Sequence, residues 1–175
     1  IKHYETRVAE GATVAGKAMF VCSNRNIAYN FYKIVKELRP EWTEKKICDD
    51  GVVLSEKDKK ELKPMEKIKL VMTRNKDDEK DLFDMLGTKE DRKEFDRQFK
   101  NPKSNFKIAI VVDMWLTGFD VPELDTIYID KPIQQHTLIQ TISRVNRVCE
   151  GKDKGLIVDY IGIKKNMNTA LKKYT

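Results

Sequence analysis

Residues 107–113 read Lys-Ile-Ala-Ile-Val-Val-Asp, so an unbroken apolar run lies between two charged residues. A short run rich in β-branched residues is typical of a strand that is covered on both faces. Further short apolar runs predict strands at residues 18–22, 68–72, 126–130 and 155–159. Helices are expected between them, and this alternation predicts an α/β fold with a parallel sheet and helices on both faces.

Apolar residues at helical spacing follow the strands. Behind the first strand, Ser23-Asn24 forms a turn and a good helix N-cap, and apolar residues recur from Ile27 to Leu38 before Pro40 ends the helix. Further helices are predicted at residues 77–87, 88–101, 136–148 and 161–175.

The chain has 175 residues, the size of one ordinary domain. It does not begin with Met and is expected to be a piece of a longer protein, with residues 1–16 leading in from a preceding part. The domain itself is placed at residues 17–160, and residues 161–175 are expected to form a helix leading to a following part. Within the domain, residues 41–67 are irregular and highly charged, and indicate an insertion between core elements.

Charge and cysteine content narrow the possible functions. Lys and Arg number 34 against 28 Asp and Glu, and this net charge of +6 permits nucleic-acid contact without requiring it. Three widely spaced cysteines without a CxxC pair argue against a disulfide framework and a zinc site, and favour a reducing cytoplasm. With two histidines, no His-rich metal site is expected. The longest apolar runs are too short to span a membrane.

Residues 117–120, Thr-Gly-Phe-Asp, directly follow the buried strand of residues 107–113. Loops at the carboxyl ends of parallel strands are where ligands bind in α/β folds. A glycine lets the backbone approach a phosphate, a threonine hydroxyl can bond to one, and an aspartate can accept from a ribose hydroxyl. The alternative is a simple turn, with Gly118 at positive φ and Asp120 capping the next element.

Residues 140–147 read Gln-Thr-Ile-Ser-Arg-Val-Asn-Arg and lie on a predicted helix. Arg144 and Arg147 are three apart and would share a helix face, where two guanidinium groups form a clamp for phosphate oxygens. A solvated surface pair is the alternative. The order of strand, TGxD loop, strand and QxxxRxxR helix is more specific than either motif alone.

In this order the motifs resemble the second RecA-like lobe of superfamily 2 helicases and translocases, a P-loop NTPase fold, over residues 17–159. Motifs IV, V and VI are matched at residues 17–23, 115–122 and 140–147. The amino-acid sequence of these motifs is most similar to that of the motor (R) subunit of type I restriction enzymes. Ser143 stands where many superfamily members have glycine, and with Asn146 it points to that branch.

The resemblance implies roles for the nucleotide-facing residues. Arg147 would be an arginine finger reaching the γ-phosphate of ATP, and Arg144 would contact phosphate or hold the finger in place. Gln140 would position water or couple the lobes. Asp120 would accept from the ATP ribose or pair with a motif VI arginine, and Gly118 would lie beside the nucleotide.

The resemblance also implies contacts with double-stranded DNA. Thr117 and Gly118 would face the DNA backbone and link its movement to the nucleotide state. Ser23, Asn24 and Arg25 would touch backbone phosphates. Such contacts are independent of sequence and sensitive to salt.

Two motor motifs are absent from the sequence. There is no Gly-x4-Gly-Lys-Ser/Thr loop and no DExH-type box, so ATP and Mg²⁺ would be held mainly by a preceding lobe. This chain alone is expected to be inactive. A nuclease-like pattern at Asp49, Glu61 and Lys63 lies in a charged run, where such spacings arise by chance.

The partners implied are an N-terminal motor lobe and nuclease domain of the same protein, and the methyltransferase and specificity subunits of a restriction complex. Two alternatives stay open. One is a lobe of another superfamily 2 DNA or RNA helicase. The other is a nucleotide-independent interaction module with the same fold.

Overall fold

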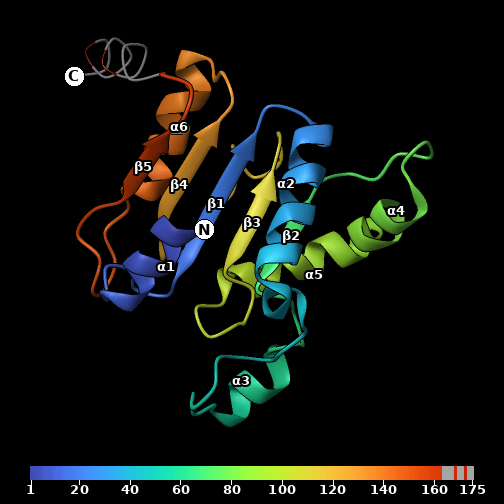
Figure 1. The fold of residues 1–175 in the computed structure, drawn as a ribbon. Coiled ribbons are helices and arrows are strands. Elements are labelled where there is room, and N and C mark those ends of the chain that lie inside the picture. Colours follow the sequence, from blue (N-terminus) through green and yellow to red (C-terminus); the bar gives the residue numbers. More distant parts are fainter. Residues whose placement is uncertain (163–167, 169–171, 173–175) are drawn as a thin grey trace.

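The computed structural model describes residues 1–162, 168 and 172 (Figure 1). Its centre is a five-stranded parallel sheet in the order β2-β3-β1-β4-β5. The strands are β1 (Lys17–Cys22), β2 (Ile68–Val71), β3 (Ile108–Val111), β4 (Leu124–Asp130) and β5 (Leu156–Asp159). The helices are α1 (Lys2–Ala9), α2 (Arg25–Leu38), α3 (Glu56–Glu61), α4 (Lys80–Leu86), α5 (Lys89–Lys100) and α6 (Gln135–Val145), with a 3-10 helix at Pro40–Thr43.

β1 lies at the middle of the sheet and pairs with β3 on one side and β4 on the other. Ala18 is in register with Ile108 and Thr126. All the strand pairings are parallel, so each connection between successive strands must cross a face of the sheet and cover it. The parallel α/β sheet with helices on both faces is therefore confirmed, and its architecture is that of a RecA-like fold.

Two apolar clusters fill the two faces. One joins the sheet to α1, α2, α4 and the 3-10 helix. The other joins it to α5, α6 and the loop after β3, whose Leu116 and Phe119 are buried. Strand side chains alternate between the clusters, as the twofold period of a strand requires. The loop of residues 117–120 is thus built into the α5/α6 face.

The charged stretch at residues 41–67 has more structure than its sequence indicates. It holds the end of the 3-10 helix and α3, and Lys46 forms an isolated antiparallel bridge with Met65. Trp42, Leu62 and Met65 are buried, so the stretch is anchored to the core. These three apolar residues stand among charged ones and follow neither the helical nor the strand period. The sequence therefore does not predict that they are buried.

The helix predicted at residues 136–148 is shorter at its carboxyl end. α6 runs from Gln135 to Val145, and Asn146 is its C-cap, so Arg147 lies beyond the helix. The helix predicted at residues 161–175 falls almost wholly outside the described residues. Among those described, no helix is long and apolar enough to cross a membrane.

Lys17, the first residue of β1, has no exposed surface. Its Nζ donates to the backbone oxygen of Phe106 at 2.6 Å and lies 5.1 Å from the ring centroid of Phe99. Burial lowers the pKa of this amine well below its ordinary value of 10.5. The unfolded chain therefore binds more protons than the folded one between the two pKa values.

We predict that Lys17→Met removes part of the pH dependence of stability. In the native protein, stability should rise as pH increases from the lowered pKa of Lys17 toward 10.5, because folding disfavours the protonated amine. Urea unfolding of both proteins from neutral to alkaline pH should show a flatter rise for Lys17→Met. Parallel curves for the two proteins would contradict this.

Candidate functional site

The loop after β3 and helix α6 line an open cavity of about 620 Å³. Its lining comprises Gly118, Phe119, Asp120, Ile139, Gln140, Ser143, Arg144 and Arg147. Five of the predicted site residues, from two segments, thus lie around one space. They are Gly118, Asp120, Gln140, Arg144 and Arg147.

An aromatic stack fixes the loop. Trp115 and Phe119 lie parallel, with ring centroids 4.3 Å apart and an interplanar angle of 4°. Phe99 of α5 stacks on both rings, at 5.3 Å from Trp115 and 6.0 Å from Phe119. With its two aromatic residues held inward, the loop leaves Thr117, Gly118 and Asp120 exposed. Trp115 therefore packs against the core, and its ring faces other side chains.

The backbone of Trp115 is strained. Its φ is 65°, and it is the only described residue other than glycine in the left-handed region. A bulky side chain is rare there, and such a conformation persists only where its surroundings enforce it. Here the stack holds the ring, and Arg144 Nη1 donates to the Trp115 backbone oxygen at 3.2 Å. Arg144 thereby ties α6 to the loop.

The two arginines have different surroundings. Arg144 is partly buried, and burial lowers the pKa of its guanidinium. Arg147 is about half exposed and forms an ion pair with the Asp120 carboxylate, which raises the pKa of Arg147. The prediction that both share a face of one continuous helix is wrong, because Arg147 follows the C-cap. The turn nevertheless brings Arg147 back to the same cavity.

Gln140 has a neighbour that its sequence motif does not include. Its Nε2 lies 3.0 Å from Nε2 of His136, one turn earlier on α6. The spacing of four residues is the only sequence signal for this pair. The contact holds the Gln140 amide on the cavity wall.

The other predicted DNA-facing residues lie at the carboxyl end of β1 and have partners inside the protein. Ser23 Oγ donates to the backbone oxygen of Asp130 at 2.6 Å. Asn24 Oδ1 accepts from Ile27 N at 2.9 Å and caps α2. Arg25 binds both carboxylate oxygens of Asp78 at 2.6 Å. These contacts fasten the turn after β1.

No metal-binding group is formed in the described part of the chain, where no three His, Cys, Asp or Glu side chains come together. Glu61 and Lys63 line one cavity, while Asp49 lies 3.6 Å from Lys107 Nζ. The nuclease-like spacing of these residues therefore does not assemble a site.

The five-stranded parallel sheet flanked by helices is consistent with a RecA-like fold, and two arginines and a carboxylate lie around a cavity at its surface. Residues 14–162 match the family model for type I restriction enzyme subunit R domain 3. The chain belongs to this family.

Two relatives align with the whole chain. It is 37% identical over 178 residues to the HindI type I restriction enzyme endonuclease subunit of Haemophilus influenzae. It is 39% identical over 176 residues to a protein assigned as the MjaIXP type I restriction enzyme endonuclease subunit of Methanocaldococcus jannaschii. The chain spans 15% and 14% of the length of these relatives.

We predict that the Asp120–Arg147 pair contributes little to folding. Both side chains are about half exposed, and exposed ion pairs are weak because solvent screens them. Asp120→Asn and Arg147→Ala should each leave the Tm within about 2 °C of the unaltered chain. A drop of many degrees in a thermal melt would show instead that the pair holds the loop in place.

Proposed function

We propose that this chain is the second motor lobe of an ATP-dependent double-stranded DNA translocase in a type I restriction enzyme. One observation carries the proposal. Asp120, Gln140, Arg144 and Arg147 converge on one open cavity from two separate segments. The arginine at its rim, Arg147, has an exposed carboxylate as its partner.

Arg147 is the arginine finger in this proposal. Its guanidinium would leave Asp120 and donate to the γ-phosphate of ATP held by a preceding lobe. A planar guanidinium suits phosphate oxygens, and such a finger contributes about 10³- to 10⁵-fold in rate by stabilising charge. Mg²⁺, bound mainly by the preceding lobe, would neutralise charge on the phosphates.

Arg144, Asp120 and Gln140 would position the finger and the nucleotide. Arg144 holds the Trp115 carbonyl, so it fixes α6 relative to the loop. Asp120 keeps Arg147 extended along the rim until phosphate replaces the carboxylate, and it can accept from the ribose. Gln140, held beside His136, would orient water or couple the lobes.

Thr117 and Gly118 are the DNA-backbone contacts that the structure favours. Both are exposed, and Gly118 has φ 67° with no other group within 4 Å of where a Cβ would stand. A phosphate can therefore approach this backbone closely. Ser23, Asn24 and Arg25 would join them only by exchanging their internal partners.

Membership of the family supports a proposal for the rest of the assembly. We propose that the full protein carries a preceding motor lobe and a nuclease domain. It would work in the cytoplasm with methyltransferase and specificity subunits. Alone, the 175-residue chain should not hydrolyse ATP.

We predict that Arg147→Ala in the full-length protein lowers DNA-stimulated ATP hydrolysis by about 10³-fold or more, through loss of transition-state charge stabilisation. Phosphate release with duplex DNA measures this. Lys36→Ala, an exposed cation on α2, serves as the control and should be unchanged. Retained hydrolysis in Arg147→Ala would contradict the finger assignment and favour an interaction module.

We also predict that Thr117→Ala uncouples hydrolysis from DNA. The substitution removes an exposed hydroxyl from the loop, so basal ATP hydrolysis should persist while duplex DNA no longer stimulates it. The ratio of rates with and without DNA is the measurement. An unchanged ratio would refute the coupling role of this hydroxyl.

A further inference from the structure

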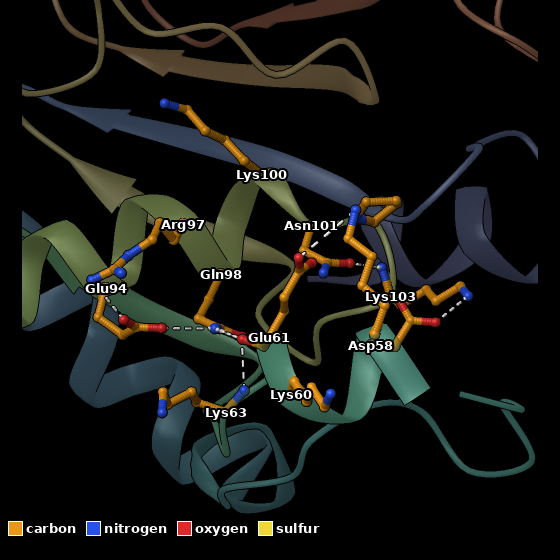
Figure 2. A pocket seen from close by; sticks show the side chains of 12 residues that line it. Asp58, Lys60, Glu61, Lys63, Glu94, Arg97, Gln98, Lys100, Asn101 and Lys103 are labelled. Atoms are coloured by element: carbon orange, nitrogen blue, oxygen red, sulfur yellow. Dashed lines mark hydrogen bonds and ion pairs between the residues drawn. The ribbon is translucent and has the colours of Figure 1, made fainter. Parts of the chain in front are cut away.

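A second, larger cavity of about 780 Å³ lies between α3, α5 and the loop before β3 (Figure 2). Six basic residues line it, against three acidic ones. The basic residues are Lys57, Lys60, Lys63, Arg97, Lys100 and Lys103.

A buried amide joins the segments that line this cavity. Gln98 is 2% exposed, and its Nε2 donates to the Glu61 backbone oxygen at 2.9 Å and to Glu94 Oε1 at 2.8 Å. Its Oε1 accepts from Lys63 N at 3.1 Å. Figure 2 shows these bonds meeting at Gln98, between the end of α3 and the last turn of α5. The two helices are therefore fixed to each other before any ligand arrives.

A second bond closes the other end of α3. Lys103 Nζ donates to Asp58 Oδ2 at 2.6 Å, and this bond and those from Ser55 hold the pKa of Asp58 at about 2. Asp58 also forms the capping box of α3 with Ser55. The short helix is thus fastened at both ends.

The charges of this cavity do not cancel. Each lining carboxylate already has a cation: Asp58 has Lys103, Glu94 has Arg97 at 2.8 Å, and Glu61 has Lys57 at 3.8 Å. Lys100 pairs with Asp96 at 2.9 Å. Lys60 and Lys63 are exposed and form no ion pair within the described residues. These two ammonium groups are the uncompensated charge.

Lys100 connects this cavity with the first one. Its Nζ lies 5.1 Å from the ring centroid of Phe119, which lines the cavity at α6 beside Gly118. In Figure 2 the Lys100 side chain points away from the other labelled residues. The contact between Lys100 and Phe119 therefore joins the basic cavity to the loop of residues 117–120.

We propose that the cavity between α3 and α5 binds the phosphodiester backbone of duplex DNA through Lys60 and Lys63. This inference extends the DNA contact of the proposed function beyond Thr117 and Gly118. Flexible, exposed ammonium groups suit a regular row of phosphates, because they supply point charges without demanding a base sequence. The fixed positions of α3 and α5, and the adjoining loop of residues 117–120, favour DNA over an acidic protein segment as the ligand.

The test is the salt dependence of duplex binding by the full-length protein carrying Lys60→Gln and Lys63→Gln. A labelled duplex is titrated without ATP between about 50 and about 200 mM salt. Each phosphate contact contributes about 0.9 to the slope of log K against log salt, so the slope should fall by about 1.8. Lys33→Gln with Lys36→Gln is the matched control, with two exposed lysines, also three apart, on α2.

A slope lowered in the Lys60/Lys63 variant and unchanged in the control supports the proposal. Equal slopes in the two variants overturn it. An unchanged DNA slope with lost binding of the methyltransferase subunit also overturns it, and makes the cavity a protein-docking surface. Because no ATP is present, these outcomes are independent of the Arg147 result.

Discussion

The stack of Phe99, Trp115 and Phe119 is the contact on which the functional face depends. It buries aromatic surface from α5 and from the loop after β3, and it holds Trp115 at a positive φ that a tryptophan would not adopt unaided. With the rings inward, Thr117, Gly118 and Asp120 are left at the surface. The stack thus decides which side chains of the loop face solvent and which face the core.

Arg144 and Arg147 belong to one sequence motif but differ in their surroundings and contacts. Arg144 is partly buried and bonded to the strained Trp115 backbone, so its guanidinium is part of the frame. Arg147 lies past the end of α6 and is bonded to an exposed carboxylate, so it can change partner without disturbing the core. In the proposed motor the first arginine would therefore position the site, and the second would contact the nucleotide.

The fold could be predicted closely from the sequence, and the site only in outline. Runs of β-branched residues such as Ile108–Val111 locate the strands because burial on both faces demands them. The end of α6 could not be placed, since Arg147 continues the helical spacing after the chain has left the helix. The Arg25–Asp78 pair joins residues 53 apart, and the φ of Trp115 is set by tertiary packing. Neither leaves a local pattern.

The charged stretch at residues 41–67 also shows what the sequence alone cannot predict. The sequence does not distinguish the charged residues that form ion pairs from those that do not, and Lys57 to Glu61 has the pattern of one solvated run. The fold distinguishes them, because Gln98 and Lys103 fix the position of α3. Each carboxylate that lines the cavity between α3 and α5 then pairs with a cation, whereas Lys60 and Lys63 pair with no carboxylate within the described residues. Net charge gives only the excess of +6, whereas a partner responds to where the unpaired charge lies. Lys60 and Lys63 are two such unpaired charges, and they line a cavity with α5, whose Phe99 and Lys100 also contact the loop of the proposed site. One helix thus supports both surfaces, and DNA held at one would lie against the element that positions the other.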